Sequence, residues 1–418
     1  VALAAAAGRA GAGAAAAEEA PTVRLSSGEA LPLVGLGVGN LAHDLIEEAV
    51  VAAVDRHGVR LVDTAAASKN EHIVAAALRR ADRGSEVTVL TKVWYTHLGF
   101  ERTLFSVRES LERLGLGGGG ARRPAVLLHW PRCRSDVSWM RCEEEEAELP
   151  EEVRRLGPAP HLDADAWQGS WRALEKLYRE GLVSSIGVSN FDPRQMEALA
   201  GMAEIKPHIL QGSLWHLLFD PALMEVLERH GVVFQVYSVM SGTLGDGKQA
   251  SVAYQSLSAL GQELGVASPS QLILGWLVQQ GVSVVPRSSS MEHLLANSPA
   301  SAGAVPQLNA AQQERVRGAV VALLRGTGDG APNSGTVRAA FANRAAEPVE
   351  VLWLHPQTGA EVRAAGTIPP GGESEIGSHP GHVFVARSLS SGEVLQRFKV
   401  TAGYGHLQKF RVAAEGEL

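Results

Sequence analysis

Gly58-Val-Arg-Leu-Val-Asp-Thr-Ala-Ala-Ala-Ser-Lys-Asn-Glu71 is the stretch of this chain that decides the fold. Leu61 and Val62 predict a short buried strand, Asp63 ends that strand, and Lys69-Asn-Glu71 begins the next helix. A barrel enzyme keeps its catalytic groups at the carboxyl ends of such strands. An aspartate that only caps the following helix leaves the same pattern, so Asp63 alone does not decide the matter.

Two other predicted strands end in the same way. Lys92 lies near the end of the apolar segment 87–94, and His129 follows the apolar part of 125–131. Parallel strands place their carboxyl ends at one face of a barrel, so both side chains are expected to meet Asp63 there. Three chemically active side chains in equivalent positions indicate a catalytic site.

Apolar strands alternate with amphipathic helices over about 300 residues. After a hairpin at 23–33, strands are expected at 33–36, 60–63, 87–93, 125–130, 184–189, 208–214, 232–238 and 282–286. Helices with core-facing spacing are expected at 44–57, 71–81, 101–114, 167–180 and 193–200. This repetition predicts a parallel (β/α)8 TIM barrel. A doubly wound sheet is the alternative, disfavoured because no G-x-G-x-x-G turn follows the first strand.

The composition fits a large barrel with a small second module. The chain has 418 residues and an apolar content of 45%, which is ordinary for a globular protein. Its net charge of −7 argues against a general nucleic-acid or membrane-surface binder. Its two cysteines, Cys133 and Cys142, favour free thiols in a reducing, cytoplasmic compartment over a local disulfide. Residues 1–21, rich in alanine and glycine, are expected to be a disordered extension. The alternative is a transit-peptide remnant of an organellar protein.

The sequence pattern changes near residue 325. Residues 326–335 are glycine-rich and predict a linker. In 336–418, β-type runs at 336–342, 348–354, 382–387 and 394–400 predict a small all-β sandwich. Within the barrel region, the long acidic loop after Pro131 is expected to be a solvated face or a cover for the barrel mouth.

Residues 22–325 resemble the aldo-keto reductase family, a (β/α)8 barrel that uses NADP(H). The resemblance implies an oxidoreductase that reduces a small aldehyde or ketone to an alcohol. Its motifs, in family order, are 58–70, Thr91-Lys-Val-Trp94, Leu128-His-Trp-Pro131, Gly187-Val-Ser-Asn-Phe191, Gln211, Tyr237-Ser238 and Val285-Pro-Arg-Ser-Ser289.

The resemblance implies a catalytic tetrad of Asp, Tyr, Lys and His, of which Asp63, Lys92 and His129 occupy three positions. The tyrosine position holds Ser68, which is smaller than a phenol and a much weaker acid. In the family the tyrosine gives the proton, the lysine–aspartate pair lowers its pKa, and the histidine orients the carbonyl. Three outcomes are open: a water held by Ser68, Lys92 and His129 donates the proton, Tyr95 replaces the tyrosine, or reductase activity is lost.

The positions that bind the nicotinamide also match the family. Ser189, Asn190 and Gln211 match the groups that hydrogen-bond the carboxamide, and Tyr237 matches the ring that stacks on the nicotinamide. An aromatic side chain and a glutamine on barrel strands are often ordinary core residues. Their occurrence at successive strand ends in family order favours the cofactor site.

The far end of the cofactor and the substrate pocket follow from the same resemblance. Arg287 and Ser288 match the site of the adenosine 2′-phosphate, where a cation meets a dianion, and Asn297 matches an adenine contact. The family's second arginine falls at His293, so a weaker or pH-dependent preference for NADP is expected. The substrate mouth is expected to be lined by Trp94, Tyr95 and Trp130.

Residues 336–412 resemble the β-domain of the von Hippel–Lindau tumour suppressor. The matching segments are Phe341-Ala-Asn-Arg344, Val351-Leu-Trp-Leu354, Thr367-Ile-Pro-Pro-Gly371 and Ser378-His-Pro-Gly-His-Val-Phe384. The resemblance implies a hydroxyproline-peptide pocket at Trp353, Ser378, His382 and Phe384. Phe384 stands where the family has tryptophan, and Ala365 where it has tyrosine. The lost hydroxyl leaves a buried polar partner unpaired, at a cost of roughly 1–3 kcal/mol. A sandwich that only packs against the barrel is an equal alternative.

Three functions therefore remain open for the chain. They are a carbonyl reductase, an NADP(H)-binding scaffold without turnover, and a hydroxyproline-peptide adaptor. A metal site is not expected, because His129, His216 and His293 are not at ligand spacing and the cysteines lack a C-x-x-C pattern. The chain is expected to be a monomer.

Overall fold

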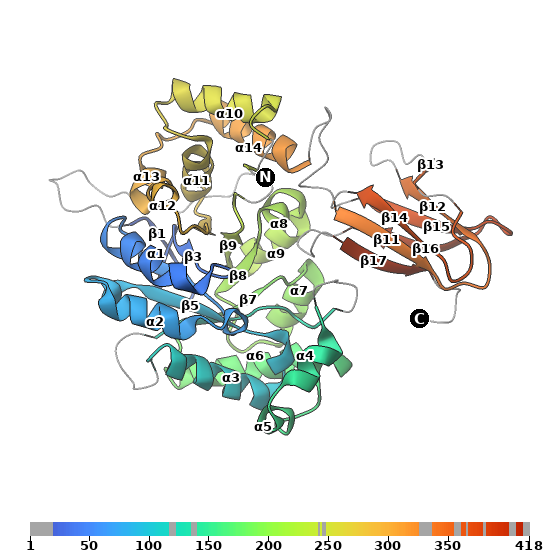
Figure 1. Ribbon diagram of the computed structural model, residues 1–418, viewed down its shortest axis with the longest axis horizontal. Coiled ribbons are helices and arrows are strands. Elements are labelled where there is room, and N and C mark those ends of the chain that lie inside the picture. Colours follow the sequence, from blue (N-terminus) through green and yellow to red (C-terminus); the bar gives the residue numbers. More distant parts are fainter. Residues whose placement is uncertain are drawn as a thin grey trace. The chain divides into compact units, whose positions relative to one another are not determined.

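The computed structural model describes residues 20–116, 123–134, 140–240, 243–244, 248–325, 337–354, 361–364, 367–378, 382–400 and 407–412. The chain divides into two compact units, Val1–Cys133 with Glu146–Val321, and Arg134–Glu145 with Ala322–Leu418 (Figure 1). The extension expected at 1–21 lies outside the described residues except for its last two. The linker expected at 326–335 lies outside them entirely.

Eight parallel strands form the sheet of the first unit, and neighbouring strands are consecutive in the chain. Parallel bridges from Val34 to Val284 and from Gly37 to Arg287 join the last strand to the first. The expected TIM barrel is therefore confirmed, with the first strand beginning later than expected. The strands are β3 (Leu36–Gly37), β4 (Leu61–Asp63), β5 (Thr88–Val93), β6 (Ala125–Leu128), β7 (Ser185–Ser189), β8 (Ile209–Ser213), β9 (Val233–Tyr237) and β10 (Ser283–Val285).

Helices follow the strands and surround the barrel (Figure 1). Several end at glycines with positive φ, including Gly231 at +65°, which closes α9 in the left-handed conformation. None of the helices in the described ranges is long and apolar enough to cross a membrane. Two helices, α4 (Cys142–Glu148) and α14 (Ala310–Arg325), extend from the first unit into the second. The other helices of the first unit are α1 (His43–Asp55), α2 (Glu71–Arg80), α3 (Phe100–Arg113), α5 (Glu151–Arg154), α6 (Ala166–Arg179), α7 (Pro193–Met202), α8 (Leu214–Phe219), α9 (Pro221–His230), α10 (Val252–Glu263), α11 (Pro269–Gln279), α12 (Met291–Ala296) and α13 (Pro299–Gly303).

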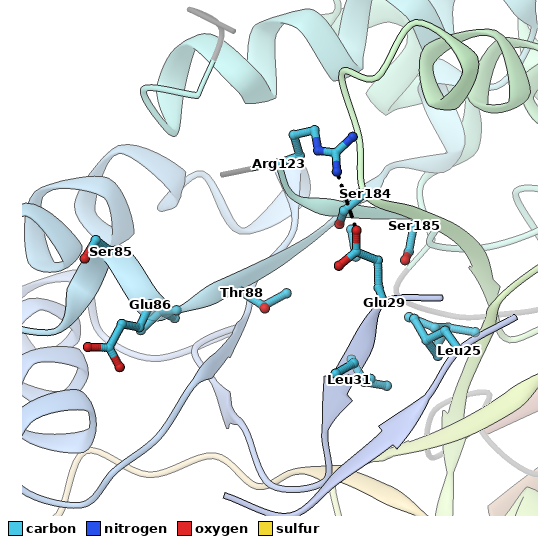
Figure 2. A pocket seen from close by; sticks show the side chains of 13 residues that line it. Leu25, Glu29, Leu31, Ser85, Glu86, Thr88, Arg123, Ser184 and Ser185 are labelled. Atoms are coloured by element: carbon cyan, nitrogen blue, oxygen red, sulfur yellow. Dashed lines mark hydrogen bonds and ion pairs between the residues drawn. The ribbon is translucent and has the colours of Figure 1, made fainter. Parts of the chain in front are cut away.

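The expected hairpin, β1 (Thr22–Arg24) paired antiparallel with β2 (Ala30–Pro32), supplies two leucines to the barrel core. Leu25 and Leu31 pack in one cluster with Leu61 and Leu90 of the strands. Beside the hairpin, a cavity of about 240 Å³ is lined by the first residues of β5 to β8 (Figure 2). Arg123 and Glu29 form an ion pair at its edge, 3.5 Å apart. This cavity lies at the amino ends of the strands, opposite the expected site.

The acidic segment after Pro131 is helical, forming α4 and α5. Arg102 of α3 is 1% exposed and binds Glu146 through two hydrogen bonds of 2.8 Å. The same guanidinium donates to the carbonyls of Thr96 and Gly157. This acidic residue is therefore held by a buried cation rather than solvated.

Both cysteines of the chain, Cys133 and Cys142, are disulfide-bonded. The expectation of two free thiols is wrong. Spacing in the sequence does not show which side chains the fold brings together. The cysteine count therefore gives no support for a reducing compartment.

The second unit contains two β-sheets. One has the order β14 (Glu373–Ser378), β11 (Val337–Asn343), β17 (Leu407–Val412), and the other has the order β13 (Glu361–Arg363), β12 (Val349–Leu354), β15 (Val383–Ser388), β16 (Val394–Lys399). Phe341 is fully buried and contacts Phe384, Phe398 and Phe410 with ring centroids 5.3 to 5.6 Å away. A separate all-β region is present after α14, as expected. Strands β13, β14 and β17 were missed, because their residues are mostly polar or exposed.

Candidate active site

Asp63 and Lys92 form a buried ion pair at the carboxyl ends of β4 and β5. Lys92 Nζ donates to Asp63 Oδ1 at 2.6 Å and to the carbonyl of Thr64 at 2.8 Å. Asp63 is 7% and Lys92 4% exposed. An ammonium has three donors, and among the described residues these two acceptors are its only partners. One N–H of Lys92 is thus left for a group that enters the site.

Side-chain alternation explains why these residues point into the barrel. Leu61 and Leu90 belong to the barrel core, and Asp63 and Lys92 stand two residues further along the same strands. Successive strand side chains alternate between faces, so residues two apart share one face. Leu127 and Ile209 precede His129 and Gln211 in the same way.

His129 follows β6 and contacts Trp94 edge-on, with ring centroids 4.9 Å apart. Burial and, secondarily, the charge of Lys92 hold the pKa of His129 well below its usual range. The imidazole is therefore neutral at neutral pH. Its Nδ1 is buried and has no hydrogen-bond partner among the described residues.

Ser68 lies in the loop after β4, at the end of a 3-10 turn (Ala66–Ser68), and is half-buried. Two bonds of Asn70 fix this loop: Thr64 Oγ1 donates to its Oδ1 at 2.5 Å, and its Nδ2 donates to the carbonyl of Val38 at 3.1 Å. The oxygen of Ser68 lies 3.6 Å from the position that a Cβ on Gly39 would take. Within the described ranges, no hydrogen bond joins Ser68 to Lys92 or to His129.

The aromatic residues expected at the substrate mouth differ in their exposure. Trp94 is half-buried, whereas Trp130 is 4% and Tyr95 only 1% exposed. Tyr95 lies in a 3-10 turn (Tyr95–His97) with its ring 4.3 Å from that of Trp94. Trp94 thus offers the largest accessible aromatic surface of the three.

Ser189 and Asn190 lie at the end of β7. Asn190 has φ of +61°, and its Nδ2 donates to the carbonyl of His129 at 3.0 Å and to Ser189 Oγ at 3.1 Å. Its Oδ1 accepts a hydrogen bond of 2.8 Å from the hydroxyl of Tyr237 at the end of β9. The structure thus brings Ser189, Asn190, Tyr237 and His129 together, and the hydroxyl hydrogen of Ser189 remains available.

Gln211 of β8 connects this group to the ion pair. Its Nε2 donates to Asp63 Oδ1 at 2.9 Å and to Oε1 of Gln235 at 2.7 Å. Gln211 is 2% and Gln235 0% exposed. The contact between Gln211 and Asp63 joins residues 148 positions apart and was not expected from the sequence. Gln235 was also missed; its polar side chain within an apolar strand was the available signal.

The residues expected to bind the 2′-phosphate and adenine lie after β10. Arg287 is exposed, and its Nη1 donates to the carbonyls of Gly39 and Asn40 at 3.3 and 3.4 Å. His293 lies exposed on α12, and Asn297 follows this helix. The Oγ of Ser288 accepts a bond from the backbone N–H of Ser290 at 3.1 Å. These four residues are exposed or half-buried, unlike the buried ion pair of Asp63 and Lys92.

The four residues expected to form a peptide pocket are neighbours in the second unit. Ser378 Oγ and His382 Nδ1 are 3.2 Å apart, and the ring of His382 lies 5.0 Å from that of Trp353. Phe384 pairs with Trp353 across β12 and β15. Phe384 is 2% exposed and packs in the core against Phe341, so it supports the group from inside.

Comparisons with known proteins agree with this barrel. Residues 34–320 match the family model described as the aldo/keto reductase family. The chain is 34% identical over 279 residues to an aldo-keto reductase of Mycolicibacterium vanbaalenii, which covers 66% of this chain and 85% of that protein. It is 30% identical over 279 residues to the glyoxal reductase of Bacillus subtilis, and this match covers 66% of this chain and 86% of that protein.

Solved structures show the same fold. An aldo/keto reductase from Brucella melitensis is 26% identical, with a TM-score of 0.56 over 72% of this chain and 99% of that one. A Bombyx mori aldo-keto reductase in complex with NADP is 23% identical, with a TM-score of 0.57 over 73% of this chain and 93% of that one.

Proposed function

Since the chain belongs to the aldo/keto reductase family, we propose that it reduces an aldehyde or ketone to an alcohol with NADPH. The observation that carries the proposal is the buried Lys92–Asp63 pair at the strand ends, with one lysine N–H left for the reacting groups. NADPH supplies the hydride that reduces the carbonyl carbon. The chain must bind and orient the reactants, exclude water and provide a proton.

The residues present fit a nicotinamide carboxamide. This group needs a donor for its oxygen and an acceptor for its NH2. Ser189 accepts from Asn190 and keeps its own hydroxyl hydrogen, whereas Gln211 uses both N–H groups within the barrel and keeps Oε1. Because Ser189 and Gln211 are register partners on β7 and β8, both groups lie at one level of the barrel.

The proton is delivered by a water that Lys92 and Ser68 hold. The ammonium of Lys92 stabilises the negative charge that develops on this water when it gives up its proton. In the family, the lysine of the tetrad has the same effect on the tyrosine phenolate. Tyr95 is the weaker candidate, because its ring is 1% exposed and packs against that of Trp94. Neutral His129 is suited to donate a hydrogen bond to the carbonyl oxygen and so to orient the substrate.

A single-turnover experiment tests the proposal. The full-length chain is mixed with stoichiometric NADPH, binding is followed by fluorescence quenching, and aromatic aldehydes and α-dicarbonyls are then added. Loss of NADPH absorbance that requires Lys92 supports the reductase. Binding without oxidation across the panel overturns it and favours a cofactor-binding scaffold.

We further propose that the second unit binds a protein segment bearing hydroxyproline. The supporting observation is the contact of Ser378, His382 and Trp353, which places two polar groups beside an aromatic face. Titration of the full-length chain with a hydroxylated peptide and its proline counterpart tests this. Tighter binding of the hydroxylated peptide that is lost in Ser378→Ala supports the proposal, and equal or absent binding overturns it.

A further inference from the structure

A row of polar side chains crosses one level of the barrel interior. Ser189 on β7 pairs in register with Gln211 on β8, Gln211 with Gln235 on β9, and Gln235 with Ser283 on β10. Each is at most 2% exposed. Barrel interiors are usually filled by branched apolar side chains, and a buried polar group is costly unless it is hydrogen-bonded. This row therefore requires an explanation.

In the hydrogen bonds of this row, each side chain donates to the next one, from Gln211 to Gln235 to Ser283. Ser283 Oγ donates to the carbonyl of Pro32 in the hairpin at 3.0 Å, and a carbonyl can only accept. Having given up its hydrogen, Ser283 Oγ can only accept, so the amide nitrogen of Gln235 must face it, at 3.0 Å. Oε1 of Gln235 then points the other way and receives the amide N–H of Gln211 at 2.7 Å.

The second N–H of Gln211 is set by an independent partner. It points to Asp63 Oδ1 at 2.9 Å, and a carboxylate oxygen is also only an acceptor. Both constraints agree on the same amide orientation. Gln211 consequently has no N–H left, and among the described residues nothing donates to its Oε1.

We propose that Gln235 and Ser283 are positioning residues for the nicotinamide subsite, because they fix the amide of Gln211 with its oxygen towards the carboxamide NH2. If the side-chain amide of Gln211 were rotated by 180°, its oxygen would face the carboxylate of Asp63. Its NH2 would then face the NH2 of the nicotinamide carboxamide. The row excludes that arrangement before the cofactor arrives. This inference rests on the proposed function and adds to it how the carboxamide is recognised.

The test compares binding of NADPH with that of its 3-acetylpyridine analogue, in which a methyl group replaces the amide NH2. Binding is measured by fluorescence quenching without any carbonyl substrate. Gln235→Met keeps the side-chain length and removes the acceptor for Gln211. We expect this variant to bind NADPH about fivefold more weakly, the scale of one neutral hydrogen bond, and the analogue within twofold of wild type. Ser283→Ala should show the same selectivity with a smaller effect.

A double-variant cycle distinguishes positioning from a general loss of stability. In a Gln211→Met background, Gln235→Met should not weaken NADPH binding further, because it acts through Gln211. Gln271→Met is the matched control, since this buried glutamine of α11 also donates to a carbonyl and accepts an N–H, at Ser301 and Ala267. It should leave the ratio between NADPH and its analogue unchanged.

The outcomes separate this inference from the proposed function. Equal weakening of both ligands by Gln235→Met, or additive effects in the double variant, overturns the positioning role while NADPH binding by the wild type still stands. A wild type that does not bind NADPH overturns both. If Gln235→Met does not fold, Ser283→Ala removes a single hydroxyl and gives the same comparison.

Discussion

Lys92 and Asp63 are 29 residues apart in sequence, and their Nζ and Oδ1 atoms lie 2.6 Å apart inside the barrel. Asp63 Oδ1 also accepts the amide of Gln211, so one carboxylate oxygen holds both the lysine and the glutamine. A buried pair of this kind contributes little net stability, because desolvation offsets the attraction. What the pair provides is an ammonium held at the carboxyl ends of the barrel strands.

Removing the ammonium should separate binding from turnover. In Lys92→Met we expect NADPH binding within a fewfold of wild type and no detectable aldehyde-dependent oxidation, because nothing stabilises the negative charge left on the water that donates the proton. Asp63 is left buried and unpaired, which should lower the free energy of unfolding by about 3–5 kcal/mol. Single-turnover absorbance and urea unfolding measure the two effects. In Asp63→Asn/Lys92→Met the stability should return without activity, and recovered activity would contradict the role of Lys92.

Restoring a phenol should accelerate the reaction. Ser68→Tyr places a stronger acid in the loop that Asn70 fixes, and we expect the single-turnover rate to rise by about 10²–10⁴, the usual contribution of general acid catalysis. Ser68→Phe is the matched control, because it adds the ring without the hydroxyl. Equal rates for the two variants would show that the ring volume matters and the acid does not.

The residue at position 293 should set the preference between NADPH and NADH. His293 is exposed on α12, six residues after Arg287 in the sequence, and His293→Arg adds a permanent cation for the 2′-phosphate. We expect the ratio of the two dissociation constants to shift about tenfold towards NADPH. His293→Gln should shift it the other way. An unchanged ratio in both variants would place the phosphate elsewhere.

Burial of His208 should make stability depend on pH. Burial lowers the pKa of His208 to about 4 from 6.5, and its Nδ1 accepts the N–H of Ile186 at 3.0 Å. Between these values the unfolded chain binds more protons than the native protein, so the free energy of unfolding falls as the pH drops from 6.5 towards 4. His208→Asn keeps an acceptor for the N–H of Ile186. Between pH 7 and 5 the free energy of unfolding of this variant should fall by about 2 kcal/mol less than that of wild type.

Urea unfolding at the two pH values measures this difference between His208→Asn and wild type. His72→Asn, at an exposed position of α2, is the matched control for the histidine-to-asparagine change. Parallel curves for wild type and His208→Asn would mean that His208 titrates alike in both states.

The barrel could be predicted because its evidence is local. Alternating apolar strands and amphipathic helices recur along the chain, and Leu61–Asp63 and Leu90–Lys92 each show an interior residue followed two places later by a functional one. The second unit was harder. Its strands β13 and β17 have little apolar alternation, and β17 pairs in parallel with a strand far earlier in the chain. Short polar strands carry no sequence signal that separates them from loops.

The sequence by itself determined the barrel and placed Asp63, Lys92 and His129 at the carboxyl ends of its strands, with Ser68 in the loop after β4. Only the tertiary structure decided that Gln211 binds Asp63, that Gln235 and Ser283 lead from it to Pro32, and that both cysteines are disulfide-bonded. The physical reason is that the apolar periodicity that predicts strands and helices depends only on residues close together in the sequence. A hydrogen bond between Ser283 and Pro32, 251 residues apart, exists only once the barrel has closed and its register is fixed.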